Sequence, residues 1–226
     1  GSFNFLGTDN ASAAASPLAF YKFYAGEGGM RVPLVISGPP VVAPSRLAHG
    51  FAYVKDVAAT VLDIANVEHP GLHYQGKDIE RMTGKSLLPI LQARTERVRA
   101  DSEVIGYEVG GNAALFQGDY KIVMNRPSVG DGRWHLYNIA EDPGEYRDLA
   151  LELPGRFRRM RDAYERYVKD NGVLPVPDDY DQVQQVGVRG YQALGKRYGG
   201  IAGLLGLILL ACGWVLGSRF FRHRTS

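Results

Sequence analysis

The sequence predicts an α/β protein whose second half is a small four-stranded antiparallel sheet with one packed helix, followed by one transmembrane helix. Three patterns support this fold class. A short apolar run bounded by glycine and proline precedes an amphipathic helical pattern, as in α/β domains. Four short β-like runs separated by glycine-containing turns come next. Near the end, Gly199–Gly217 contains nineteen residues and no charged side chain.

Composition indicates a folded protein and excludes several classes. Hydrophobic residues make up 45% and charged residues 22% of the 226 residues, so the chain can bury a core. The 26 basic and 24 acidic residues leave a net charge of +2 with histidine neutral. This balance argues against a nucleic-acid-binding protein, and we expect no such partner. Cys212 is the single cysteine, which excludes an intrachain disulfide and a cysteine-based zinc site.

The first hundred residues carry the α/β elements. Gly1–Pro17 is rich in small and polar residues and predicts an irregular surface loop. Val32–Ser37 predicts a buried strand, because it is short, apolar and bounded by glycine and proline. Apolar residues recur at helical spacing in Asp56–Ala65 and predict a helix, with Asp56 available near its N-terminal end as a cap.

Residues 101–172 predict the small sheet and its helix. Gly118-Asp119 lies between two β-like runs and is a signal for a two-residue hairpin. Pro154–Asn171 then places apolar residues on one side of a helix, which Gly172 should end from the C′ position. The expected strands are Val104–Glu108, Ala113–Gln117, Tyr120–Met124 and Trp134–Asn138.

The C-terminal residues predict a membrane anchor. Residues 173–198 form a linker and juxtamembrane segment, and 218–226 form a basic tail. A helix needs about twenty apolar residues to cross the hydrocarbon core, so Gly199–Gly217 is long enough. Tyr198 and Trp214 suit the two interfaces. We expect a single-pass membrane protein whose upstream domain is periplasmic or otherwise extracytoplasmic. Equal numbers of basic residues flank the span, so its orientation stays open.

Three strings of residues, in order between about Ser2 and Val173, resemble segments of the type I sulfatases. The resemblance is closest to the bacterial arylsulfatases of the alkaline phosphatase superfamily. Ala59 stands where that family usually has proline. The strings are Tyr21-Lys22 with Glu27–Pro33, then Val54–Asp63, then Gly118–Lys121 with Trp134–Asn138 and Asp142–Glu145.

The resemblance implies a fold and a reaction. Residues 1–100 would be the C-terminal end of an alkaline-phosphatase-like sulfatase domain, and residues 101–172 its small sheet and helix. In this family a formylglycine, made from the Cys or Ser of a C/S-x-P-x-R motif, is hydrated beside Ca²⁺ and attacks the sulfate ester. That motif is absent here. We therefore expect the nucleophile and most calcium ligands to lie upstream in a longer parent, and this fragment alone to be inactive.

Lys22 is the candidate substrate-binding residue. It resembles the lysine that contacts the sulfate group in the family, and a compact ammonium suits a tetrahedral anion. The alternative is an ordinary solvated loop lysine. Asp9-Asn10 resembles a calcium-binding pair, since carboxylate and amide oxygens suit that ion. Because Ala11 follows the pair and no predicted strand precedes it, we assign no metal ligand and no catalytic residue within this chain.

The resemblance implies that the parent hydrolyses sulfate esters at a membrane surface, with a sulfate ester and the lipid bilayer as partners. Two alternatives remain open. One is a phosphonate or phosphate ester hydrolase of the same superfamily, which would share the scaffold. The other is a non-catalytic, membrane-tethered binding protein that has kept the scaffold. The upstream sequence and a substrate profile would discriminate among the three.

Overall fold

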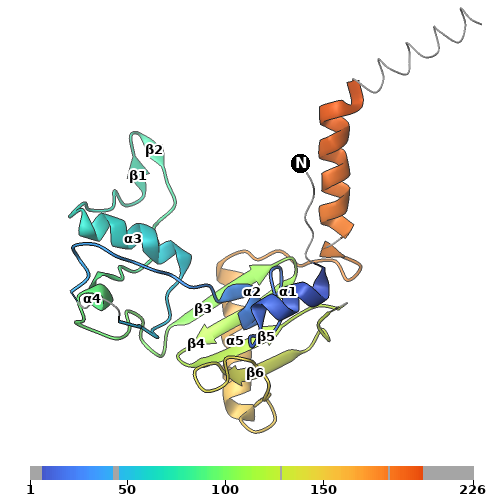
Figure 1. Cartoon of the computed structure of the whole chain (residues 1–226), viewed down its shortest axis with the longest axis horizontal. Helices are drawn as coiled ribbons and strands as arrows, with labels where there is room; N and C mark the ends of the chain where they lie inside the picture. Colours follow the sequence, from blue (N-terminus) through green and yellow to red (C-terminus); the bar gives the residue numbers. More distant parts are fainter. Residues whose placement is uncertain (1–6, 43–45, 128, 183, 201–226) are drawn as a thin grey trace, which may run out of the picture. The chain divides into compact units, whose positions relative to one another are not determined.

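The structure is a computed structural model that describes residues 7–42, 46–127, 129–182 and 184–200. By its internal contacts the chain divides into two units, Gly1–Leu174 and Pro175–Ser226, which we describe separately. All the labelled helices and strands belong to the first unit (Figure 1). The division at residues 100 and 101 that the sequence predicts stays a prediction.

An antiparallel sheet of four strands organises the first unit, in the order β3-β4-β5-β6. Each predicted strand is confirmed, and β3 and β4 are each one residue longer than expected. The order follows the chain because the connections are short. Gly118, with φ of +59°, helps the two-residue turn between Gln117 and Tyr120, which pair in register. The strands are Val104–Val109, Asn112–Gln117, Tyr120–Met124 and Trp134–Asn138.

Both faces of this sheet are covered. Helix α5, Pro154–Asp170, packs on one face, and the segment around α2, Glu27–Met30, packs on the other. Figure 1 shows α5 behind the strands and α2 in front of them. Because successive side chains of a strand point to opposite faces, β4 is buried over most of its length. Buried residues on the α5 side are Leu115, Ile122, Leu136, Met160 and Ala163; those on the other side are Ala25, Ala114, Phe116 and Val123.

Two helices match their predictions closely. Helix α5 ends one residue earlier than expected, and Gly172 follows with φ of +61°, the left-handed conformation that ends a helix. Helix α3, Val54–Ile64, begins two residues earlier than expected. Asp56 caps it, because its Oδ2 accepts a hydrogen bond of 2.7 Å from the backbone N–H of Tyr53.

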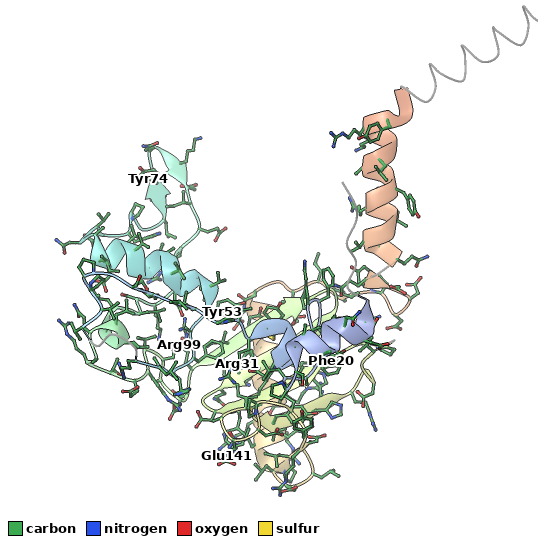
Figure 2. All side chains as sticks on the ribbon, in the orientation of Figure 1. Phe20, Arg31, Tyr53, Tyr74, Arg99 and Glu141 are labelled. Carbon is green, nitrogen blue, oxygen red and sulfur yellow. The ribbon has the colours of Figure 1, made fainter. Side chains whose placement is uncertain are left out.

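Shorter elements lie between α3 and the sheet. A small hairpin pairs β1, His73–Tyr74, with β2, Lys77–Asp78, and Figure 2 labels Tyr74 on it. One further turn of helix, α4, covers Leu88–Leu91.

Two predictions for the N-terminal segment are wrong. Gly1–Pro17 was expected to be irregular, whereas Thr8–Ala15 forms helix α1, in which four alanines supply strong helix propensity. Val32–Ser37 was expected to be a buried strand, yet it has no regular structure, and Val32 and Val35 are 77% and 90% exposed. A strand needs a hydrogen-bonded neighbour, and within the described residues no strand pairs with this segment.

In the second unit, residues 184–200 are helical. The predicted transmembrane run Gly199–Gly217 lies outside the described residues except for its first two positions. Among the described residues, no helix is both long and apolar enough to cross a bilayer. The membrane anchor therefore stays a prediction.

Candidate functional site

Residues from two of the sequence strings meet in a buried cluster of charges. Lys121 of β5 places its Nζ 2.9 Å from Oε1 of Glu27 and 2.8 Å from Oε1 of Glu145. The backbone N–H of Glu27 donates a hydrogen bond of 2.9 Å to Oε2 of Glu145. Glu27 begins α2, and Glu145 lies in the turn after β6. The cluster thus joins the loop that carries Lys22 to the sheet and to the turn that follows it.

Lys121 lies inside because of its place in β5. Its neighbour Ile122 faces α5, so Lys121 faces the other side, where Phe116 and Tyr137 are its cross-strand partners. Its ammonium lies 5.2 Å from the centroid of the Phe116 ring, within the range of a cation–π contact. The side chain is 0% exposed. A buried ammonium requires opposite charges, and Glu27 and Glu145 supply them.

The cluster carries one more acidic group than basic groups. Burial raises the pKa of Glu145, and the Lys121 ammonium and the N–H of Glu27 offset only part of that effect. Glu145 also adopts φ of +57°, an uncommon backbone conformation for a residue other than glycine. Because burial raises its pKa, the carboxyl of Glu145 holds its proton to a higher pH than a free glutamate does.

Gly28 and Gly29 allow the loop to fold back closely on itself. A Cβ atom at Gly28 would lie 2.2 Å from the carbonyl oxygen of Phe20, and one at Gly29 would lie 2.2 Å from that of Tyr24. The N–H of Gly28 also donates to the carbonyl oxygen of Ala19. The two glycines serve close backbone packing, and they fix the path from Phe20 to Met30.

The structure places Lys22 in the turn that this packing creates. The N–H of Tyr24 donates a hydrogen bond of 3.1 Å to the carbonyl oxygen of Tyr21, so Lys22 and Phe23 occupy the two central positions of the turn. The side chain of Lys22 is exposed, and its Nζ lies 5.1 Å from the centroid of the Phe23 ring. Its role in binding sulfate stays a prediction.

The described residues bring together no set of acidic, histidine or cysteine side chains for a metal ion. Asp9 and Asn10 lie on the exposed surface of α1, and calcium takes six to eight oxygen ligands. Within the part of the chain that the structure describes, no group of three or more His, Cys, Asp or Glu residues could hold a metal ion. We derive no chemical step through a metal from this chain.

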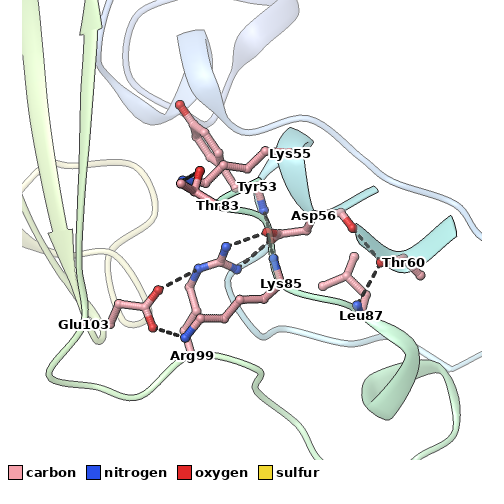
Figure 3. A network of polar contacts seen from close by, with 9 residues as sticks. All are labelled: Tyr53, Lys55, Asp56, Thr60, Thr83, Lys85, Leu87, Arg99 and Glu103. Atoms are coloured by element: carbon pink, nitrogen blue, oxygen red, sulfur yellow. Dashed lines mark hydrogen bonds and ion pairs between the residues drawn. The ribbon is translucent and has the colours of Figure 1, made fainter. Parts of the chain in front are cut away.

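A second buried network holds the start of α3. Arg99 donates hydrogen bonds of 2.6 and 2.5 Å to the two carboxylate oxygens of Asp56, and Figure 3 shows Arg99 reaching Glu103 as well. The backbone N–H groups of Tyr53 and Lys85 donate to the same carboxylate. Burial raises the pKa of Asp56, but these bonds outweigh it and hold the pKa below its usual value. With four donors the carboxylate is saturated, so its role is structural.

His135 lies between two carboxylates at the sheet. Its Nδ1 is 2.8 Å from Asp148 and its Nε2 is 3.0 Å from Asp131. Burial lowers the pKa of His135, but the hydrogen bonds to Asp131 and Asp148 raise it by more, so the pKa lies above its usual value. A protonated imidazole donates through both nitrogens, which leaves neither of them for a ligand.

Comparison with known proteins identifies the family. No family model matches the chain. An uncharacterized sulfatase of Schizosaccharomyces pombe is 31% identical over 179 residues, which cover 79% of this chain and 32% of the relative. Steryl-sulfatase of Mus musculus is 24% identical over 182 residues, covering 67% of this chain and 28% of the relative. The chain belongs to the sulfatase family. It corresponds to the C-terminal portion of a sulfatase and spans about a third of these curated relatives.

A solved structure confirms the fold of this sulfatase chain. The crystal structure of i-CgsB in complex with k-i-k-neocarrahexaose superposes with a TM-score of 0.55. The match covers 77% of this chain and 36% of that one, at 19% sequence identity. The chain therefore has a sulfatase-like α/β fold with a four-stranded antiparallel sheet.

The sequence strings contain Glu27, Lys121 and Glu145, but their pairing was not predicted. One signal was available, because Lys121 lies within a predicted strand, between Tyr120 and Ile122. A lysine at such a position faces water unless that face of the sheet is covered. Which face is covered depends on a segment more than ninety residues away, and a local pattern does not contain that information.

Replacing Lys121 by methionine tests the cluster. The variant Lys121→Met keeps the length of the side chain but leaves two buried carboxyl groups without a cation. We expect the free energy of unfolding to fall by about 3–5 kcal/mol. Urea unfolding followed by tryptophan fluorescence, to which Trp134 of β6 contributes, measures it. The control Lys169→Met, at an exposed position of α5, should change it by less than about 0.5 kcal/mol. Adding Glu27→Gln and Glu145→Gln to Lys121→Met should restore most of the loss, and no loss in Lys121→Met would contradict the ion pairs.

Glu145 should make the stability of the fold depend on pH. Its folded-state pKa is raised above the ordinary 4.5, so its contribution is complete below about 4.5 and is lost as pH rises through the folded-state pKa. The variant Glu145→Gln mimics the protonated carboxyl. We expect its stability relative to the wild type to increase as pH rises from about 4.5. Urea unfolding at a series of pH values measures this. Glu141→Gln, at the exposed residue labelled in Figure 2, should leave the pH profile unchanged.

Proposed function

We propose that this chain is the C-terminal part of a longer type I sulfatase of the alkaline phosphatase superfamily that hydrolyses sulfate esters. One observation carries the proposal. Two of the three strings that resemble sulfatases in sequence come together in space, where Glu27, Lys121 and Glu145 hold the loop that presents Lys22. The relatives support the same reaction class, since the named ones are sulfatases and one of them is a steryl-sulfatase.

In this proposal the chain contributes scaffold and substrate binding. The C/S-x-P-x-R motif is absent from its sequence, and its described residues offer no calcium ligand set. A formylglycine nucleophile and Ca²⁺, held by the longer protein, would supply the attack on sulfur. The exposed ammonium of Lys22 would neutralise an oxygen of the sulfate group while the bond from sulfur to the ester oxygen breaks.

Exposed apolar side chains support a larger domain. Val35, Leu47 and Val54 are 90%, 81% and 81% exposed, although residues of this kind are usually buried. They lie in the segment after α2, before α3 and at the start of α3. We assign the rest of the sulfatase domain as the structure that covers them, since the chain matches only 32% of its Schizosaccharomyces pombe relative. Val32–Ser37 would find its neighbouring strands there.

The role of Lys22 is tested in the longer polypeptide that contains this chain. Loss of one donor that stabilises developing charge typically costs about 10²–10³ in rate. Lys22→Ala should lower kcat/KM for an aryl sulfate by that factor and leave the thermal midpoint nearly unchanged, because the side chain is exposed. Lys22→Arg should restore only part, since a planar guanidinium does not replace a compact ammonium.

Four results would contradict parts of this proposal. Near-normal kcat/KM of Lys22→Ala would remove Lys22 from the substrate site, with Lys169→Ala as the matched control. Turnover by residues 1–226 alone would show that the chemistry does not need a longer protein. A preference for phosphonate or phosphate esters over sulfate esters would move the protein to the related hydrolases, and no turnover of any ester would favour a non-catalytic binding protein.

We propose further that a C-terminal helix anchors this sulfatase to a membrane, with the upstream domain periplasmic or otherwise extracytoplasmic. The uncharged run Gly199–Gly217 supports it, as do Arg219, Arg222 and Arg224 directly after the run. The chain should remain with membranes during carbonate extraction, and truncation after Val173 should release it. Recovery of the intact chain in the soluble fraction without detergent would overturn the anchor.

A further inference from the structure

The turn that carries Lys22 has a backbone conformation that needs external support. Phe20 and Phe23 adopt φ of +63° and +86°, the left-handed region that bulky aromatic residues rarely occupy. Phe23 stands at the third position of its turn, where a positive φ usually selects glycine. Residues held in this way persist only when their surroundings determine the conformation, and they are concentrated at functional sites.

Two asparagine side chains of the sheet supply that support. Asn112 donates a hydrogen bond of 2.7 Å from Nδ2 to the carbonyl oxygen of Phe23. Asn125 accepts a hydrogen bond of 2.7 Å at Oδ1 from the backbone N–H of Ala25. Both side chains belong to buried residues. They hold the chain on the C-terminal side of Lys22, at a carbonyl and at an N–H group two residues apart.

The sheet sets the orientation of these amides. Asn112 begins β4, and Asn125 directly follows β5, next to the paired residues Ala113 and Met124. The Oδ1 atom of Asn112 already accepts a hydrogen bond of 2.8 Å from the N–H of Arg126, so its Nδ2 must face the loop. The donor thus faces a carbonyl oxygen, and the acceptor of Asn125 faces an N–H group. Because one amide donates and the other accepts, the two hydrogen bonds fix the orientation of the backbone at Phe23 and Ala25 as well as its distance from the sheet.

We infer that Asn112 and Asn125 are positioning residues that hold Lys22 in its substrate-binding geometry. The inference rests on the proposed sulfatase function, and it assigns to the small sheet a direct role at the substrate site. Asn112 and Asn125 do not touch the substrate in this account. They fix the turn, and the turn sets the direction of the Lys22 side chain, whose ammonium contacts the Phe23 ring.

The backbone part of the inference is tested on the full chain by amide hydrogen exchange. The N–H of Ala25 should be protected in the wild type, and Asn125→Ala should accelerate its exchange. Asn138→Ala is the matched control, because Asn138 lies on β6 and its side chain accepts a local hydrogen bond from the N–H of Ala140, far in sequence from the Lys22 loop. It should leave the exchange at Ala25 unchanged. Equal exchange rates in the wild type and Asn125→Ala would show that the hydrogen bond to Asn125 does not hold the backbone at Ala25, and would overturn the inference.

The positioning part is tested by kinetics of the longer sulfatase polypeptide. Asn112→Ala and Asn125→Ala should each lower kcat/KM for an aryl sulfate by about 10- to 100-fold, as a displaced binding group does. In a Lys22→Ala background the same changes should cause little further loss, because Lys22 is the group that they position. Asn112→Asp should lose at least as much as Asn112→Ala, since its carboxylate would face the carbonyl oxygen of Phe23.

The outcomes separate this inference from the proposed function. An impaired Lys22→Ala enzyme whose losses add fully to those of Asn112→Ala and Asn125→Ala would overturn positioning and keep the proposed role of Lys22. Full activity of Asn112→Asp would do the same. Full activity of Lys22→Ala would overturn both, because no binding group would then remain to be positioned.

Discussion

A lysine ammonium that is shielded from water dictates much of this structure. Lys121 points into the covered face of the sheet, and a buried cation is tolerated only beside opposite charges. Glu27 and Glu145 satisfy this requirement from segments on either side of β5 in the sequence. Their presence brings the Lys22 loop onto one face of the sheet and the turn after β6 against it. The same face of the sheet also buries Ala25, which directly follows the turn at Tyr21–Tyr24.

The two buried ionic networks of this sulfatase chain differ in their charge balance. The Asp56 carboxylate has four donors and a lowered pKa, so it is ionised and fully satisfied. The cluster around Lys121 has two carboxyl groups for one ammonium, and the pKa of Glu145 is raised. The first network fastens α3 where apolar contacts are few, since Val54 and Val61 remain exposed. The second fastens the Lys22 loop and is sensitive to protonation.

Local sequence patterns predicted the sheet well and the N-terminal segment poorly. The strands from Val104 to Asn138 pair in sequence order, the first three through tight turns and the last through the loop 125–133, so their pairing needs mainly information contained in nearby residues. Helix α5 is likewise encoded by its own apolar periodicity. Val32–Ser37 has the composition of a strand, but a strand also requires partners, and composition does not supply them. The role of Lys22 stays a prediction, and the hydrogen bonds of Asn112, Asn125 and Lys121 join residues far apart in the sequence, which a local pattern does not reveal.

The layered arrangement of the sheet has a consequence for the order of assembly. β3 to β6 form a meander in which each strand pairs with the next, and α5 follows directly, so little chain entropy is lost in closing these loops. The contact between Glu27 and Lys121 instead spans 94 residues of sequence. Its partners are in place only when β5 is already paired, because Lys121 acquires its direction from the strand. We therefore expect the meander to form first and the Lys22 loop to dock on it afterwards.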